Sequence, residues 1–391
     1  MLFPKFQFFL LSFLLSTTNI IAQIECGDAY PIPNSETMLN QIVTKGNFVA
    51  WTDIWDEIQL YNIEKNEIFT VHEQDMDTYT QGISLTENYL YYSLSNQGIS
   101  RLKLDDYSVE YLIGTNAYFS VNGTEMVYTD GNSGESNQVY FYSEDAAPLL
   151  LSGFCETARH LSIGEDRIYF SCNDGEIGEL YLYKISEGLT ELVDEYEYTS
   201  PINYYPRVLF HENYTFLTKR IDGKAALLRH EVSTNQLDTL LADENTSAFY
   251  NDIDANQLSY TYGNEIYIFN ISDNSTIVVP QSQNGLNSRF GLNSILWQDF
   301  MGNLKNYNFT DETVSQIADG GAEDFIIFTL SNDYLVYTQG TTVEHILVLE
   351  SNFPLEVQVE QVTNVSGSEA NGSINISVGH SLGGLTYSWM G

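Results

Sequence analysis

Residues 47–53 read NFVAWTD, and the same seven-residue pattern recurs along most of the chain. The further copies are NYLYYSL (88–94), TEMVYTD (124–130), DRIYFSC (166–172), NYTFLTK (213–219), NQLSYTY (256–262), NSILWQD (293–299) and DYLVYTQ (333–339). The fifth position is aromatic in all copies except at Leu217, and the sixth is Ser or Thr in all except at Gln298. The copies lie about forty residues apart, which marks an internal repeat.

Each copy is surrounded by further short apolar runs. A run such as TQGISLT (80–86) precedes it, a run such as ELYLYKI (179–185) follows it, and a looser run such as NEIFTV (66–71) comes third. These runs alternate with period two, are rich in Tyr, Ile, Val, Phe and Thr, and are separated by Asn, Asp and Gly. They therefore predict strands.

Four strands in about forty residues form one blade of a β-propeller. One blade cannot bury both of its faces, so blades must stack in a ring, with the fifth-position aromatics packed between them. We expect an all-β propeller over residues 39–362 with eight four-stranded blades; seven blades plus a degenerate unit are the alternative. Ring closure can also pair a strand from one chain end with the other end.

These strand patterns resemble the divergent TolB-like and DUF5050-like propellers over most of the chain. The resemblance implies a fold rather than an activity, because propellers host unrelated functions.

The first 22 residues, MLFPKFQFFLLSFLLSTTNIIA, predict a secretory signal peptide. Their apolar run is short and interrupted, which disfavours an uncleaved membrane anchor. Residues 23–38 are then a lead-in to the propeller. In an exported protein, Cys155 and Cys172 are candidates for a disulfide within one blade, with two buried thiols as the alternative. Cys26 is left over.

The chain of 391 residues has 53 acidic and 15 basic side chains and a formal net charge of −38. Such a surface repels nucleic acid and anionic lipid, so neither is an expected partner. It keeps the protein soluble and attracts divalent cations.

Near the end of the chain, GHSLGG (379–384) matches the G-x-S-x-G motif of serine hydrolases around Ser381. A hydrolase needs an oxyanion-hole loop before this Ser and an acid and a His after it. About twenty residues separate the propeller from the preceding strand, and the sequence ends at Gly391. We therefore interpret Ser381 as part of a turn.

Residues 363–391, together with Val362, contain VTNVS, NGSINISV and GGLTYSW, and this pattern resembles an SprB-type repeat. Such repeats are small immunoglobulin-like or PKD-like β modules in surface proteins of type IX-secreting bacteria. Gly367 stands where a Cys is usual. Only two or three strands are present, so we expect a truncated module and a fragment of a longer protein.

Strand order brings acidic and aromatic loops to one face of the predicted ring. The ligand-face candidates are Asp75, Asp77, Asp194, Tyr196 and Tyr198. Tyrosines near Pro201 can stack on sugar rings or simply pack within a loop.

Asp130 and Asn132 begin a D-x-N-x-G sequence that is typical of calcium loops, but Phe141 replaces the acid expected at the twelfth position. A polar turn needs the same residues. Calcium is therefore the only cofactor that the sequence raises, and only as a weak candidate.

Together these features predict a secreted or cell-surface propeller that acts as a binding or scaffold module of a larger adhesin-like protein. The expected partner is an extracellular protein or glycan. The alternatives are an extracellular carbohydrate lyase or hydrolase, and the front half of a propeller-type serine peptidase. The sequence assigns no catalytic residue.

Overall fold

The computed structural model describes much of the chain. The described ranges are 30–32, 39–53, 55–73, 78–114, 117–130, 138–144, 146–174, 176–197, 204–221, 224–243, 248–291, 293–319, 328–330, 334–339, 345–350, 356–363 and 373–379. Contacts divide the chain into a compact unit that spans Cys26–Ser351 and a second unit to which Asn352–Gly391 belong.

Seven sheets of the first unit each contain four consecutive antiparallel strands. The first three are β2 (Leu39–Lys45), β3 (Phe48–Asp53), β4 (Ile58–Asn62) and β5 (Glu67–His72); β6 (Thr80–Leu85), β7 (Tyr89–Leu94), β8 (Gly98–Lys103) and β9 (Val109–Ile113); and β10 (Ala117–Asn122), β11 (Glu125–Asp130), β12 (Gln138–Tyr142) and β13 (Leu149–Leu150). We call the seven sheets blades 1 to 7 in chain order, so these three are blades 1 to 3.

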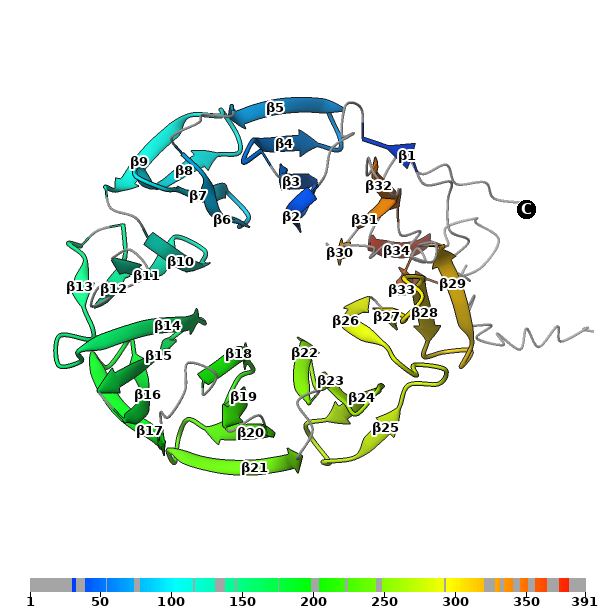
Figure 1. The fold of residues 1–391 in the computed structure, drawn as a ribbon. Coiled ribbons are helices and arrows are strands. Elements are labelled where there is room, and N and C mark those ends of the chain that lie inside the picture. The colour runs from blue at the N-terminus through cyan, green and yellow to red at the C-terminus, as the bar shows by residue number, and fades with distance from the viewer. Residues whose placement is uncertain are drawn as a thin grey trace, which may run out of the picture. The chain divides into compact units, whose positions relative to one another are not determined.

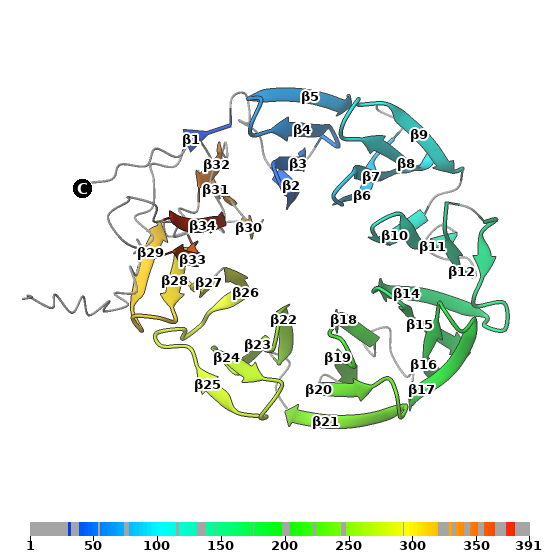
Figure 2. The same cartoon turned by 180° about the vertical axis from the view of Figure 1, so that it is seen from behind.

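Blades 4 to 7 continue around the ring (Figures 1 and 2). They are β14 (Thr157–Ile163), β15 (Arg167–Asp174), β16 (Ile177–Lys184) and β17 (Leu189–Glu197); β18 (Tyr204–Phe210), β19 (Tyr214–Ile221), β20 (Lys224–Glu231) and β21 (Gln236–Asp243); β22 (Phe249–Asp254), β23 (Gln257–Tyr262), β24 (Glu265–Asn270) and β25 (Thr276–Val278); and β26 (Leu286–Gly291), β27 (Ser294–Gln298), β28 (Leu304–Asn308) and β29 (Val314–Ala318).

A composite four-stranded sheet closes the ring. It joins β30 (Phe328–Leu330), β31 (Tyr334–Gln339) and β32 (His345–Glu350) to β1 (Tyr30–Pro31) from the other end of the chain. Because the last repeat supplies three strands, the structure has seven blades that are continuous in sequence, not eight. The predicted pairing between the two chain ends is confirmed by the register of β1 against β32.

The aromatic positions of the repeat lie between neighbouring sheets, as predicted. Trp51 of blade 1 packs against Tyr334 and Val336 of the closing sheet. Trp297 of blade 7 is fully buried in a cluster that includes Ile268 of blade 6. Each sheet thus covers the apolar face of its neighbour, which a single sheet cannot do for itself.

Two hydroxyl groups at the sixth position of the repeat, those of Ser93 and Thr218, reach the next blade. Ser93 Oγ donates a 2.6 Å hydrogen bond to the carbonyl oxygen of Ala117 on β10. Thr218 Oγ1 accepts one from the backbone N–H of Tyr250 on β22 at 3.2 Å. These bonds join a second strand to the first strand of the following blade, in buried surroundings where an unpaired polar group is costly.

The second unit contains an antiparallel pair, β33 (Glu356–Thr363) and β34 (Ser373–Gly379). Residues Asn352–Gly391 fall outside the compact unit Cys26–Ser351 that contains β1 to β32. The predicted strand at 374–378 lies within β34. Ser381 and the rest of the predicted SprB-like module after Gly379 lie outside the described residues.

Candidate ligand-binding face

Two kinds of connection emerge at the same end of the sheets: the loops from second to third strand, and those from fourth strand to the next blade. Hydrogen bonds join them where blades 1 and 2 meet. Asp56 Oδ1 accepts from the N–H of Thr80 at 3.1 Å, and Ser95 Oγ accepts from the N–H of Tyr79 at 2.8 Å. We call this end of the propeller the loop face.

Several large apolar side chains are exposed on the loop face. They are Trp55, Tyr79, Phe154, Ile177, Phe300 and Met301. Turns between strands are ordinarily polar, so large exposed apolar side chains on these turns mark a candidate interaction surface. We call these six side chains the tips of the loop face.

The blade-1 turn, Asp53–Glu57, is organised by one nearly buried carboxylate. Asp53 Oδ1 accepts from the backbone N–H of Trp55 at 2.8 Å and of Glu57 at 3.0 Å. The N–H of Asp56 donates to the Asp53 carbonyl oxygen at 3.1 Å, and Asp56 has a positive φ of 66°. These hydrogen bonds fix the backbone of the turn that carries Trp55, whose side chain is 59% exposed.

Tyr79 is 53% exposed and comes from the adjoining connection between β5 and β6. Its neighbour Thr80 donates from Oγ1 to the Asp56 carbonyl oxygen at 2.9 Å, in addition to the bond from its N–H to the Asp56 carboxylate. Trp55 and Tyr79 therefore stand on two loops that are bonded to one another. We call this pair the aromatic corner.

The blade-7 turn, Asp299–Asn303, repeats the same geometry. Asp299 Oδ1 accepts from the N–H groups of Met301 and Asn303, both at 2.9 Å, and Gly302 occupies the positive-φ position at 83°. Its apolar tips are Phe300, 74% exposed, and Met301, 54% exposed.

The two turns differ in charge. Lys305 Nζ lies 3.0 Å from Asp299 Oδ2, whereas blade 1 has Gln59 at the matching strand position. Burial alone would raise the pKa of Asp299, but hydrogen bonds from Lys305 and Asn303 outweigh it and lower this pKa.

The calcium candidate Asp130 occupies the same repeat position as Asp53 and Asp299. Its Oδ1 accepts from the N–H of Gln138 at 3.0 Å across the end of the β11–β12 hairpin. This is the bonding expected of a polar turn. Asn132 lies outside the described residues, and among those described no group of three His, Cys, Asp or Glu side chains is placed to hold a metal.

Of the predicted ligand residues, Asp194 and Tyr196 are brought together by Lys219 of the next blade. Lys219 Nζ forms an ion pair with the Asp194 carboxylate and lies 5.7 Å from the centre of the Tyr196 ring. The Tyr196 ring is buried and lies against Gly178. A buried ring offers no free face to a sugar, so this trio fastens blade 4 to blade 5. Asp75, Asp77 and Tyr198 lie outside the described residues.

The structure joins Cys155 and Cys172 in a disulfide with a Cα–Cα distance of 5.5 Å. The bond ties the connection between blades 3 and 4 to the end of β15. Phe154, beside it, contacts Tyr181 edge to face at a ring-centroid distance of 5.0 Å and remains 59% exposed. The disulfide thus anchors another aromatic tip of the loop face.

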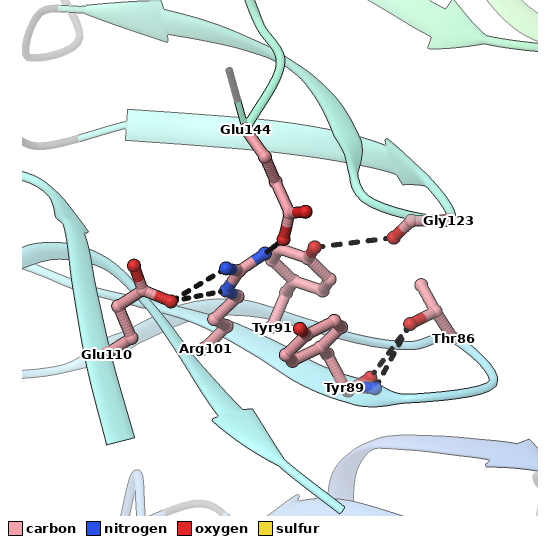
Figure 3. A network of polar contacts seen from close by, with 7 residues as sticks. All are labelled: Thr86, Tyr89, Tyr91, Arg101, Glu110, Gly123 and Glu144. Carbon is pink, nitrogen blue, oxygen red and sulfur yellow. Dashed lines mark hydrogen bonds and ion pairs between the residues drawn. The ribbon is translucent and has the colours of Figure 1, made fainter. Parts of the chain in front are cut away.

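Away from the loop face, the positively charged side chain of Arg101 lies between an aromatic ring and two glutamates of the same chain (Figure 3). Its guanidinium lies 4.2 Å from the centre of the Tyr89 ring and forms ion pairs with Glu110 at 2.7 Å and Glu144 at 2.5 Å. Burial would lower the pKa of Arg101, but hydrogen bonds to Tyr91 and the two glutamates raise it. An aromatic ring with flanking carboxylates thus holds a nearly buried positive charge.

Sequence reasoning did not find Trp55, Tyr79 or Arg101. The signal for the first two was available: both are aromatic residues within predicted loops next to carboxylates. Arg101 carried no such signal, because Glu144 comes from the next blade and is distant in sequence.

No protein-family model and no curated protein matches this sequence. The fold is similar to that of the computationally designed Ika8 protein, with a TM-score of 0.59 and 10% identity over 83% of this chain and 98% of that one. BamB from Moraxella catarrhalis aligns with a TM-score of 0.54 and 11% identity over 83% of this chain and 99% of that chain. The Dos1 propeller aligns with a TM-score of 0.59 and 6% identity over 83% and 94%. These similarities show that the chain folds as a β-propeller.

Within the described residues, no helix is long and apolar enough to cross a membrane.

Proposed function

We propose that this protein is an extracellular binding propeller, secreted or held at the cell surface, which presents its loop face to a protein or glycan ligand. The observation that supports this proposal is the set of exposed aromatic tips on turns that are rigidly hydrogen-bonded at one end of the sheets. A propeller provides a stiff frame for such loops, and loops on rigid scaffolds commonly carry binding sites.

The composition of the tips fits a binding surface. Large exposed apolar side chains on the outer strands are mostly aliphatic, such as Val109, Leu149 and Leu189, whereas those of the loop face are Trp, Tyr, Phe and Met apart from Ile177. Protein interfaces are enriched in these aromatic residues and in Met, and hot-spot residues are more often Trp or Tyr than Leu or Val.

The rigidity of the turns also favours binding. The Trp55 and Met301 backbones are fixed by carboxylates that already accept two N–H bonds each. A side chain that is positioned before binding loses less conformational freedom when the ligand arrives.

The extracellular part of the proposal is supported by the predicted signal peptide at residues 1–22 and by the Cys155–Cys172 disulfide. Disulfides persist in oxidising compartments. The SprB-like pattern after Val362 supports a place within a larger adhesin-like protein exported by type IX secretion.

The test compares two pairs of substitutions in the full chain. Trp55→Ser with Phe300→Ser removes two exposed loop-face side chains, and Tyr111→Ser with Leu189→Ser removes two exposed outer-strand side chains. Binding is measured against a defined glycan array and a panel of purified extracellular proteins. We expect ligands of the unmodified chain to be lost by the first pair and kept by the second.

Equal retention in both variants, or ligands lost only by the outer-strand pair, would contradict the proposal. Catalytic turnover of an array glycan or panel protein, insensitive to the loop-face pair, would instead support the enzyme alternatives. Circular dichroism melting curves control for folding of both variants.

A further inference from the structure

The aromatic corner on blade 1 combines two exposed rings with a one-signed charge environment. Asp53, Asp56 and Glu57 belong to the Trp55 turn, and Glu73 follows β5 on the strand end from which the Tyr79 connection leaves. Each of these side chains is an acid, so the loops that carry the two rings also carry four carboxylates.

Lys and Arg side chains are sparse in this part of the chain, and the nearby basic group is the imidazole of His72 at the end of β5, whose Nε2 lies 3.4 Å from Thr78 Oγ1. Between Lys45 and Arg101 the sequence has one Lys or Arg, Lys65. Lys65 lies on the turn between β4 and β5, which emerges at the opposite end of the blade from the Trp55 turn, and its Nζ lies 5.8 Å from the centre of the Tyr107 ring. The loops of the corner therefore carry four acidic side chains, and blade 1, β6 and β7 bring no Lys or Arg side chain to this end of the sheets.

From this arrangement we infer that the aromatic corner, Trp55 with Tyr79, takes a Lys or Arg side chain from a basic segment of a partner protein. The inference rests on the proposed function and names the class of partner for one part of the loop face. A cation is attracted to the face of an aromatic ring, Trp most strongly, and to the carboxylates around it.

The Arg101 cluster is an internal precedent. There the Arg101 guanidinium lies 4.2 Å from the centre of a Tyr ring and forms ion pairs with two glutamates. The aromatic corner offers the same two components, aromatic rings and acidic side chains on the same loops, but its rings are exposed to solvent.

Charge complementarity selects a protein over the other classes of partner. A net charge of −38 repels nucleic acids and acidic glycans, and a neutral glycan gains nothing from the carboxylates' charge. A basic protein segment gains both the long-range attraction and the contact with the rings.

The experiment titrates the full chain with a peptide of alternating Gly and Lys/Arg residues and with a matched peptide in which Gln replaces every Lys and Arg. Isothermal titration calorimetry gives the Kd in low and in physiological salt. We expect the basic peptide alone to bind, with an affinity that falls as salt rises.

Substitutions locate the binding. Trp55→Ala and Tyr79→Ala should each weaken binding about tenfold, and Trp55→Phe should retain most of it. Asp56→Asn keeps an acceptor for Thr80 but removes the charge, and we expect about threefold weaker binding. Tyr111→Ala, 60% exposed on outer strand β9, is the matched aromatic control and should leave the Kd unchanged.

Two outcomes overturn the inference. If the basic peptide binds equally to the Trp55→Ala, Tyr79→Ala and Tyr111→Ala variants, the attraction comes from the overall charge. If the Gln peptide binds as well as the basic one, the corner is an apolar site. In either case, ligands found with the array and the panel that still depend on the loop face would leave the proposed function standing.

Discussion

The turns of blades 1 and 7 have the same backbone design and carry different side chains. In both, an Asp at the seventh repeat position accepts two backbone N–H bonds and the fourth turn residue has a positive φ. Blade 1 then presents Trp55 among acids, while blade 7 presents Phe300 and Met301 beside an Asp299 that is paired with Lys305. The comparison separates what the fold requires, the Asp-capped turn, from what is free to serve binding, the exposed tip.

The largest effects on stability should come from substitutions in the strand that precedes each turn. Trp51→Ala and Trp297→Ala should each lower the free energy of unfolding by about 3–5 kcal/mol, because both side chains fill the space between neighbouring sheets. Urea or thermal unfolding measures the change. A loss below about 1 kcal/mol at either site would contradict the inter-blade role of the fifth position.

The next largest effects on stability should come from the two carboxylates that accept backbone hydrogen bonds in the turns. Asp53→Ala and Asp299→Ala each leave two backbone N–H groups without their partner and should cost about 1–3 kcal/mol of unfolding free energy. The matched control is Asp311→Ala in an exposed turn between β28 and β29, where we expect a smaller loss. Equal losses at all three sites would show that the two loop-face turns are not special.

The pH dependence of stability should distinguish Asp299 from its Asn variant. The pKa of Asp299 is lower in the folded protein than its ordinary value of 3.8, so its stabilising effect is present above that value. As the pH falls from there through the folded-state pKa, the advantage of the unmodified chain over Asp299→Asn should disappear. Unfolding midpoints measured between pH 6 and the acid limit of folding test this, and an advantage that persists at the lowest pH would contradict it.

The tips should matter for binding and hardly at all for folding. Trp55→Ala and Met301→Ala should each change the unfolding free energy by no more than about 0.5 kcal/mol, since both side chains are more than half exposed. Only Trp55→Ala should weaken binding of the basic peptide. Loss of binding in the Met301 variant as well would mean that the two tips act as one surface.

The smallest effect on binding should come from exchanging the second residue after each turn, Gln59 in blade 1 and Lys305 in blade 7. Gln59→Lys gives blade 1 the basic side chain that blade 7 has at Lys305, and it should weaken binding of the basic peptide about twofold to fivefold by competition and charge. Lys305→Gln is the reciprocal variant. Unchanged affinity in Gln59→Lys would show that the difference in charge between the turns has no role in recognition.

Much of the fold could be predicted because it depends on a repeated local pattern. The fifth-position aromatics, the strand alternation and the pairing of the chain ends follow from the need of each sheet to cover its neighbour. The sequence left the choice between eight blades and seven blades plus a degenerate unit open, because the composite sheet depends on two residues, Tyr30 and Pro31, that pair across the ring closure. Two residues are too few to show a strand pattern.

The site was predicted less well, for a physical reason. Asp194 and Tyr196 fall in a predicted loop region, but whether a side chain is buried depends on the next blade, which supplies Lys219. Trp55 and Tyr79 behave in the opposite way: their place in acidic loops was visible in the sequence, but their exposure is set by the hydrogen-bonded turns that carry them. Exposure at a blade boundary is set by tertiary packing and cannot be read from a single strand.

The most direct test of the account is hydrogen–deuterium exchange of the full chain with and without the saturating basic peptide. We predict added protection of the backbone at residues 53–57 and 78–80, with little change in the blade-7 turn at 299–303. Protection centred on the blade-7 turn or on the outer strands, with none at the aromatic corner, would contradict the claim that blade 1 carries the recognition site.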